Sequence, residues 1–307
     1  MSSESLLFVC QASHEIGLGH LSRITNLIEE CKKHTENQLD LIVFSSVDLK
    51  KRLKKFNYKV YPENSLQRVI ESTILSKDYT TVILDLCPRK LPDYMMEFLE
   101  ELNQRDIKIL SIDALYEYHS LINFFWIPSF FYNENHFPAL KGKCKSGWDS
   151  LLIKKRLETP IWKEGNRILV LTGASDPFKM SGLIPKILEG HVKKKMQIHW
   201  VRGPFSEAPY IPKGRHEWKV HENPLTLDDL IFDSNYVISV FGVSFFEVLQ
   251  YGIPTLVFSP YGSKDNQELE ALREEKVAII SKDINHLGIE LNQLMENKVT
   301  ARTISNN

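Results

Sequence analysis

Residues 6–23, L-L-F-V-C-Q-A-S-H-E-I-G-L-G-H-L-S-R, decide the fold that we expect for this chain. An apolar run ends at a glycine-rich turn, and an amphipathic segment begins near His20. This order predicts a buried strand, a tight turn and then a helix. Gly17 and Gly19 allow positive φ angles and a close approach of the backbone to a ligand. Because ligands of open α/β sheets bind where strands end and helices begin, this turn is a candidate functional site.

His20 is the candidate catalytic residue of the turn, because an imidazole exchanges protons near neutral pH. Arg23 follows three residues later, so on a helix it shares a face with His20. A base beside a cation suits an anionic substrate. His14 competes for the same role, although its place before the glycines predicts a loop position.

The whole chain repeats this alternation of short apolar runs and amphipathic segments. Runs rich in Ile, Leu and Val are typical of parallel strands that are buried on both faces. We expect strands at residues 6–10, 39–44, 82–86, 107–112, 167–171, 197–201, 219–221, 236–240 and 255–258. We expect helices at residues 20–33, 47–55, 67–75, 92–104, 227–232, 244–251, 266–275 and 284–297, and one more that ends at Leu188.

The charged segment 154–166, K-K-R-L-E-T-P-I-W-K-E-G-N, is typical of a domain linker. With 307 residues the chain is long enough for two domains with separate cores. We therefore predict an α/β protein of two doubly wound, Rossmann-like domains, residues 1–155 and 156–307, that face each other across a cleft.

Composition excludes several classes of protein. The net charge of -1 gives no electrostatic case for nucleic acid or acidic membranes as partners. The four cysteines lie far apart, without the spacing of a zinc site or the density of a disulfide scaffold. Since no apolar segment reaches about 18 residues, we expect a cytoplasmic protein that is neither exported nor membrane-spanning. Without an H-E-x-x-H motif or clustered carboxylates, we expect no metal and no cofactor.

A second candidate site lies in residues 237–267. A buried run ends at Gly242 and a helix opens near Ser244, so free backbone N–H groups and the positive end of the helix would face an anion such as a pyrophosphate. Glu247, one helical turn on, could accept two hydroxyls of a ribose. The alternative is that S-x-x-E at 244–247 is a capping box, which needs no ligand. The next polar turn comprises Asp265, Asn266 and Gln267.

Three further positions follow predicted strands. Gly173 opens a turn in which Asp176 precedes Pro177, which is typical of an N-terminal helix cap with proline at the first helical position. The backbone of this turn could still line the cleft. Asp85 and Asp113 each end an apolar run, so they should point toward the same cleft as His20. Either could orient the imidazole or a substrate hydroxyl, although aspartates at strand ends also cap loops.

Aromatic residues crowd segment 124–132, F-F-W-I-P-S-F-F-Y. A hydrophobic core is the expected place for so apolar a run. A wall that stacks on a sugar and a surface for a partner are the alternatives.

Several motifs together resemble the nucleotide-sugar hydrolases of the pseudaminic acid pathway. They are I-G-L-G-H-L-S-R at 16–23, G-A-S-D-P at 173–177, R-G-P at 202–204, F-G-V-S-F-F-E-V-L-Q-Y-G-I-P at 241–254, K-D-N-Q at 264–267 and G-W-D-S-L-L at 147–152. The family removes UDP from a 2,4-diacetamido-2,4,6-trideoxy hexose. It has the GT-B fold and is related to the MurG-type glycosyltransferases.

The resemblance implies that His20 positions or deprotonates the water that attacks the anomeric carbon. It also implies that the C-terminal domain holds UDP, with backbone or hydroxyl donors to phosphate from Gly242, Val243 and Ser244 and with Glu247 on the ribose. A general base contributes about 10²- to 10⁴-fold, and helix N-termini can stabilise a departing diphosphate without a metal. The implied partners are a UDP-linked amino sugar and water.

This sequence departs from the family pattern on the sugar side. Val9 and Gln11 stand where the family has an arginine and an acid, and Leu86, Cys87 and Pro88 stand where it has histidine, tyrosine and glycine. These changes favour two alternatives to hydrolysis. One is transfer of the sugar to an unknown acceptor, and the other is a nucleotide-sugar-binding protein without turnover.

Overall fold

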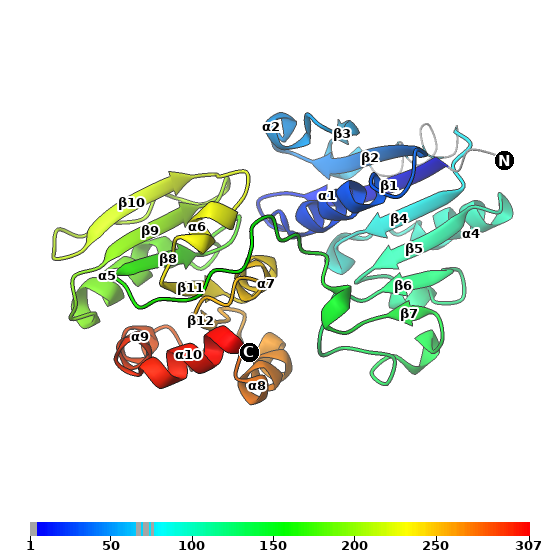
Figure 1. Ribbon diagram of the computed structural model, residues 1–307. Coiled ribbons are helices and arrows are strands. Elements are labelled where there is room, and N and C mark those ends of the chain that lie inside the picture. The colour runs from blue at the N-terminus through cyan, green and yellow to red at the C-terminus, as the bar shows by residue number, and fades with distance from the viewer. Residues whose placement is uncertain (1–4, 66–68, 70–73, 75–76) are drawn as a thin grey trace. The chain divides into compact units, whose positions relative to one another are not determined.

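The computed structural model describes residues 5–65, 69, 74 and 77–307 of the chain. The chain divides into two compact units, Met1–Ile153 and Lys154–Asn307, called unit 1 and unit 2 below. Figure 1 shows that each unit is built on its own sheet. The helix predicted at residues 67–75 lies, apart from residues 69 and 74, outside the described residues.

Unit 1 contains a parallel sheet with the strand order β3-β2-β1-β4-β5-β6-β7. Its strands are β1 (Ser5–Ala12), β2 (Gln38–Ser45), β3 (Asn57–Tyr61), β4 (Thr81–Asp85), β5 (Lys108–Ile112), β6 (Phe124–Trp126) and β7 (Cys144–Lys145). The order reverses at β1, which pairs with β2 on one side and β4 on the other. Ligands of open α/β sheets bind at the carboxyl ends of strands beside such a switch point.

The described helices of unit 1 follow its strands. They are α1 (Gly19–Cys31), α2 (Lys50–Leu53) and α4 (Met95–Gln104), with the 3-10 turns η1 (Glu63–Ser65), η3 (Pro88–Lys90), η4 (Tyr116–Tyr118), η5 (Pro138–Leu140) and η6 (Trp148–Ser150). Alternate residues of β1 are buried on opposite faces of the sheet. Leu7 packs in the cluster that includes α4, whereas Phe8 packs in the cluster that includes α1 and α2. Helices therefore cover both faces, as parallel sheets require.

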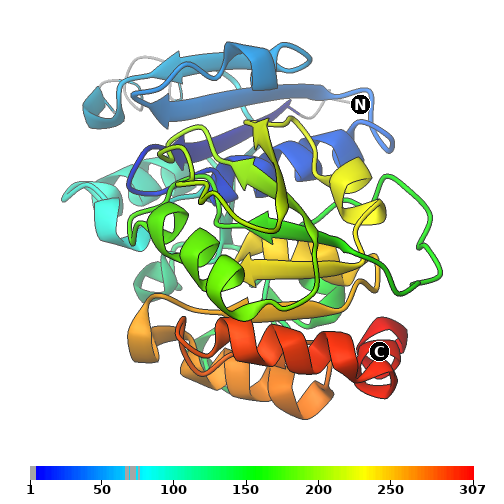
Figure 2. The ribbon, with the colours of Figure 1, turned by 90° about the vertical axis from the view of Figure 1, so that its left-hand side faces the viewer.

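Unit 2 contains a parallel sheet with the order β10-β9-β8-β11-β12-β13. Its strands are β8 (Arg167–Leu171), β9 (Gln197–Arg202), β10 (Glu217–Glu222), β11 (Tyr236–Val240), β12 (Thr255–Phe258) and β13 (Ile279–Ile280). Its helices are α5 (Met180–His191), α6 (Asp228–Phe232), α7 (Val243–Leu249), α8 (Asn266–Glu275), α9 (Leu287–Glu296) and α10 (Lys298–Asn306), with the 3-10 turn η7 (Gly262–Asp265). Figure 2 shows α9 and α10 in orange-red and red at the end of the chain.

Both faces of this second sheet are also buried. Ile168 and Val170 of β8 join a core with α5, α9 and α10, and Leu169 joins one with α6 and α7. Residues 154–166, the predicted linker, form no helix or strand. Tyr251 anchors its start, because the phenol oxygen accepts hydrogen bonds from the backbone N–H groups of Arg156 (3.1 Å) and Leu157 (3.3 Å).

The predicted elements differ from the structure mainly at short or polar segments. The helix expected at 47–55 is confined to α2, because residues 46–49 are irregular and the Asp48 carboxylate accepts the N–H of Lys50 (2.9 Å) at the start of α2. Strand β3 was not predicted, since its residues are largely exposed and carry little apolar signal. The two- and three-residue strands β6, β7 and β13 and the polar helix α10 were also missed.

Candidate functional site

The glycine-rich turn after β1 brings His20 to the carboxyl edge of the unit 1 sheet. Gly17 has φ 79°, and its N–H donates to the carbonyl of Ser13 (2.8 Å), so the chain reverses tightly. Helix α1 then begins at Gly19, which places His20 in its first turn. The region predicted to be a site therefore has the strand, turn and helix that residues 6–23 indicated.

His20 contacts Asp85, the last residue of β4. Nδ1 of His20 lies 2.5 Å from Oδ1 of Asp85. The carboxylate is fully buried, and the side chain of His20 is 16% exposed. This contact orients the ring and leaves Nε2 for other partners, which is how an acidic residue prepares a catalytic histidine.

Arg23 joins the two predicted strand-end aspartates. Its Nη2 and Nε donate to Oδ1 and Oδ2 of Asp85 at 2.7 and 3.1 Å, a bidentate pair. Its Nη1 donates to Oδ2 of Asp113 at 2.9 Å. Four predicted residues, His20, Arg23, Asp85 and Asp113, are thus brought together. Because two carboxylates already compensate Arg23, its main contribution is to hold this cluster.

The cluster shifts the protonation of its members. Burial lowers the pKa of His20, but the charge of Asp85 and hydrogen bonds to Asp85 and Cys87 outweigh this effect and raise it to about 9. Burial raises the pKa of the Asp85 carboxyl, but the charges of Arg23 and His20 outweigh burial and hold the pKa below its ordinary value. At neutral pH, His20 is therefore mostly an imidazolium paired with a carboxylate.

Cys87 is a member of the cluster that the sequence analysis did not select. A hydrogen bond with His20 lowers the pKa of the Cys87 thiol to about 7, against the opposing effect of burial. The backbone N–H of Cys87 donates to Oε1 of Gln11 at 2.8 Å, and Gln11 itself is buried at the end of β1. A signal was present, because a thiol two residues beyond a strand-end aspartate reaches the same edge of the sheet.

Asp113 connects the cluster to an aromatic group. The hydroxyl of Tyr116 donates to Oδ1 of Asp113 at 3.3 Å, and the Tyr116 ring stacks on Phe137 at 4.4 Å between centroids. In the predicted aromatic segment, Phe125 is fully buried, as expected of core. Phe130, which belongs to the same segment, stacks on Trp148, and Trp148 is 43% exposed.

The second candidate site lies in unit 2, at the start of α7. Gly242 precedes this helix with φ 151° and ψ -166°, a combination that is essentially restricted to glycine. Val243 and Ser244 are the first two residues of α7, and Glu247 is half-buried one turn further on. The capping-box alternative is wrong, because Gly242 and not Ser244 is the N-cap residue of α7.

The motifs at 173–177 and 202–204 meet in unit 2. A Cβ atom on Gly203 would lie 2.4 Å from the carbonyl oxygens of Gly173 and Ala174, so only glycine fits there. Asp176 caps α5 from outside the helix, because its two carboxylate oxygens accept the N–H groups of Met180 and Ser181 at 2.7 Å each. The proline after Asp176 does not open the helix, contrary to our expectation, since α5 begins at Met180.

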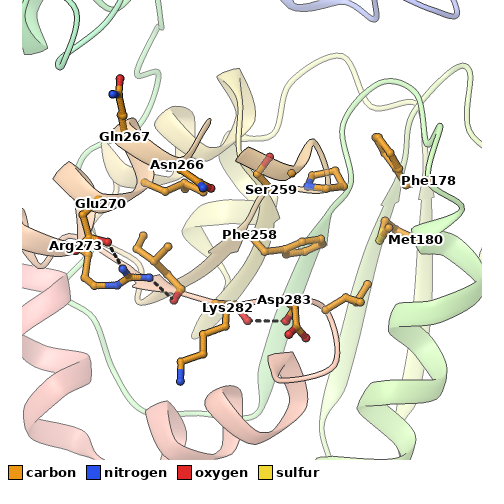
Figure 3. A pocket seen from close by; sticks show the side chains of 16 residues that line it. Phe178, Met180, Phe258, Ser259, Asn266, Gln267, Glu270, Arg273, Lys282 and Asp283 are labelled. Atoms are coloured by element: carbon orange, nitrogen blue, oxygen red, sulfur yellow. Dashed lines mark hydrogen bonds and ion pairs between the residues drawn. The ribbon is translucent and has the colours of Figure 1, made fainter. Parts of the chain in front are cut away.

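The third predicted group borders a pocket of about 800 Å³ within unit 2. Asp265 accepts the hydroxyl of Ser259, and Asn266 and Gln267 begin α8 and line the pocket. Figure 3 shows Phe178 and Met180 on one side of Phe258 and the ion pair of Glu270 with Arg273 on the other. A pocket of this size can hold a small organic ligand.

Within the described ranges, no group of three or more His, Cys, Asp and Glu side chains could hold a metal ion. A search of the same residues finds no helix that is long and apolar enough to cross a membrane.

No protein-family model matches the chain. An uncharacterized protein of Methanocaldococcus jannaschii, MJ1062, is 22% identical over 293 aligned residues, which cover 82% of this chain. The chain spans 55% of the length of that relative.

Solved structures are similar over nearly the whole chain. A putative UDP-N-acetylglucosamine 2-epimerase from Listeria monocytogenes has a TM-score of 0.66 at 12% identity, covering 98% of this chain and 90% of that one. S. aureus MnaA, solved with UDP, has a TM-score of 0.63 at 10% identity, with coverages of 98% and 91%. MurG of Acinetobacter baumannii has a TM-score of 0.60 at 12% identity, with coverages of 97% and 93%.

These similarities confirm the predicted fold class. The structural neighbours have the GT-B fold, and they include a putative UDP-N-acetylglucosamine 2-epimerase and a protein solved with UDP. At these identities the likeness extends to the fold and no further. The chain is therefore an α/β protein of the GT-B type, with two Rossmann-like domains.

Proposed function

We propose that this chain is an enzyme that hydrolyses a UDP-linked amino or deoxy sugar, in the synthesis of a surface glycan or a pseudaminic-type acid. The observation that carries the proposal is the contact of His20 with Asp85 at the carboxyl edge of the unit 1 sheet. The fold of the UDP-sugar enzymes and the motif pattern at 16–23 support the substrate class.

In the proposed reaction, the oxygen of a water molecule bonds to the anomeric carbon while the bond from that carbon to the UDP oxygen breaks. The neutral imidazole of His20 takes a proton from the attacking water. Asp85 stabilises the imidazolium that results and holds the ring in place. Since the pKa of His20 is raised to about 9, only about one molecule in a hundred carries the neutral ring at pH 7. The rate of the reaction should therefore increase as the pH rises from 7 toward 9.

We propose that unit 2 binds the nucleotide. Donors at Gly242, Val243 and Ser244 are proposed for the diphosphate and Glu247 for the ribose. Asn266 and Gln267 are proposed for the sugar, which is supported by their position on a pocket of ligand size. Gly173 contributes backbone to the same end of the sheet, whereas Asp176 is committed to capping α5.

Transfer to a sugar acceptor is the second candidate. It is favoured by the contact between Gln11 and Cys87, which puts a packed amide where the family has an acid and a thiol where it has a tyrosine. A change of acceptor would alter residues near the sugar and keep the residues that bind the nucleotide, which is the pattern of departures in this sequence.

The test is release of nucleotide from a panel of UDP- and CMP-sugars, measured by chromatography without an acceptor and then with sugar or peptide acceptors. We expect UDP release without acceptor, and loss of at least about 100-fold in His20→Gln. His14→Gln is the matched control, because His14 lies on the same turn and is exposed. Equal release by His20→Gln would contradict the proposal. Release that requires an acceptor would favour transfer.

A further inference from the structure

Aromatic side chains gather in the loops that follow β5, β6 and β7. These loops are residues 113–123, 127–143 and 146–150. Because the three strands are parallel neighbours, the loops leave the sheet at the same carboxyl edge at which Asp85 ends β4. They therefore lie along the edge that carries His20 and Arg23, and the reaction proposed above uses none of their aromatic residues.

The rings contact one another in a continuous band that begins at Asp113. The hydroxyl of Tyr116 donates to Asp113, and the Tyr116 ring stacks on Phe137. Further ring contacts, with 4.6 to 6.5 Å between centroids, join Phe137 to Tyr132, Tyr132 to Phe131, Phe131 to Phe130 and Phe130 to Trp148. Because β7 lies two strand spacings, about 10 Å, from β5, the two ends of the band lie over different strands. The end at Trp148 is therefore a separate place from the His20 cluster.

Trp148 forms the exposed end of the aromatic band. Its indole stacks on Phe130 with 23° between the ring planes, and 43% of Trp148 remains exposed. Lys145 and Asp149 flank it in the sequence and form an ion pair whose side chains are both exposed. A flat apolar surface with charged hydrogen-bonding groups at its edge suits a ligand that has an apolar face and polar edges. A pyranose ring has this form, with C–H groups on one face and hydroxyls around the edge.

The turn that carries Trp148 is fixed independently of any ligand. Gly147 has φ 100° and ψ 176°, a conformation essentially restricted to glycine, and its N–H donates to the carbonyl of Ser129 at 2.9 Å. Ser150 is fully buried in the same turn, and its carbonyl accepts the indole N–H of Trp126 at 2.6 Å. A surface that is held in this way loses little conformational entropy when a ligand binds, so the exposed indole is preorganised.

We propose that Trp148 and Phe130 form a carbohydrate-binding platform, on which a pyranose ring stacks through its C–H face. Lys145 and Asp149 then bind hydroxyls at the edge of the ring. The ring is not the sugar that reacts at His20, so the inference goes beyond the proposed function and adds a second saccharide site to unit 1. The aromatic band places this site on the same edge of the sheet as the proposed reaction.

Free saccharides test the platform without any nucleotide. Saturation-transfer difference NMR with methyl β-glucopyranoside and N-acetylglucosamine, at millimolar concentrations, reports which ligand protons contact the protein. We expect the C–H protons of one ring face to receive the most saturation. Mannitol, which has similar hydroxyls but no ring, should not bind. A bound saccharide should also protect Trp148 from quenching of its fluorescence by acrylamide, since Trp148 is more exposed than Trp126, Trp162, Trp200 and Trp218.

Variants assign the binding to the indole. Trp148→Ala should weaken saccharide binding by about tenfold or more, whereas Trp148→Phe should retain most of it, because stacking needs an aromatic ring and not the indole N–H. Tyr210→Ala is the matched control, since Tyr210 is 58% exposed in unit 2, and it should bind as the unaltered protein does. Equal binding by Trp148→Ala would overturn the proposal. The absence of both a ring-face preference and protection from acrylamide in the unaltered protein would overturn it too, even if Trp148→Ala did not fold.

UDP-N-acetylglucosamine and UDP distinguish this platform from the site of the reacting sugar. Trp148→Ala should bind both nucleotides as tightly as the unaltered protein does. Loss of affinity for UDP-N-acetylglucosamine alone would place the sugar of the nucleotide on Trp148 and would overturn the assignment to a second saccharide. None of these measurements needs turnover, so absence of UDP release would contradict the hydrolase proposal and leave the platform unaffected.

Discussion

Oε1 of Gln11 accepts a 2.8 Å hydrogen bond from the backbone N–H of Cys87, so two positions at which the sequence departs from the pseudaminic hydrolase pattern are in direct contact. The two changes therefore form one local rearrangement. A buried amide at the end of β1 now holds the loop after β4, at the edge of the sheet where His20 lies.

This contact predicts the effect of removing the acceptor. Gln11→Met keeps the size of the side chain but leaves the N–H of Cys87 buried and unpaired, so it should lower the free energy of unfolding by about 1–3 kcal/mol. Denaturation in urea, followed by circular dichroism, measures the change. Gln293→Met on the exposed face of α9 is the control and should stay within about 0.5 kcal/mol. Equal stability of the two variants would mean that the hydrogen bond contributes nothing.

Asp85 and Asp113 share Arg23 but should differ greatly in their contribution to stability. Asp85→Asn removes a fully buried charge that compensates the largely covered side chains of Arg23 and His20, so we expect a loss of about 3–5 kcal/mol. Asp113→Asn alters a carboxylate that is 46% exposed and should cost less than about 1 kcal/mol. Guanidinium unfolding curves of both variants at pH 7 provide the comparison. A larger loss in Asp113→Asn would reverse our assignment of the central carboxylate.

The raised pKa of His20 gives two opposite dependences on pH. The folded pKa of about 9 exceeds the ordinary value of 6.5, so the stability that His20 contributes is complete below pH 6.5 and is lost as pH rises through 9. Proposed base catalysis needs the neutral ring, so UDP release should increase over the same interval and level off above about pH 9. Unfolding free energies of the unaltered protein and His20→Gln, measured from pH 6 to 10, should converge as the rate rises. A rate that falls from pH 7 to 9 would exclude His20 as the base.

Much of the first site could be predicted because strand ends in a parallel sheet share one edge. Asp85 and Asp113 were selected on that ground alone, and both meet the cluster through Arg23. In the second half of the chain, the predicted strands at 167–171, 236–240 and 255–258 match β8, β11 and β12 residue for residue, since buried strands consist of apolar runs with clear ends.

The contacts of Gln11 and Asp176 could not be predicted in the same way. Gln11 bonds to a backbone group 76 positions away, and no spacing in the sequence encodes such a pair. Asp176 was expected to cap a helix that begins at the following proline, but the cap reaches over an intervening turn to Met180. Lys179 lies there with φ 54°, a conformation that residue preferences do not suggest.

Gly242 and Gly182 offer a matched test of the second candidate site. An added Cβ would meet no atom within 4 Å at either position, so packing does not distinguish them. The backbone does, because Gly242 has φ 151° at the start of α7 and Gly182 lies inside α5. Gly242→Ala should therefore cost about 1–3 kcal/mol in stability, whereas Gly182→Ala should be neutral or stabilising by up to about 1 kcal/mol.

The same pair of variants tests the nucleotide assignment. If the backbone at Gly242 holds the diphosphate, UDP should raise the melting temperature of the unaltered protein and of Gly182→Ala alike. The shift should shrink or vanish in Gly242→Ala, because relief of the strain moves the N–H groups at 242–244 away from their positions. Thermal unfolding at several UDP concentrations gives the affinity of each variant. If Gly242→Ala is destabilised but UDP raises its melting temperature as much as in the unaltered protein, glycine is needed at position 242 for the backbone conformation and not for nucleotide binding. The phosphate site would then lie at another turn.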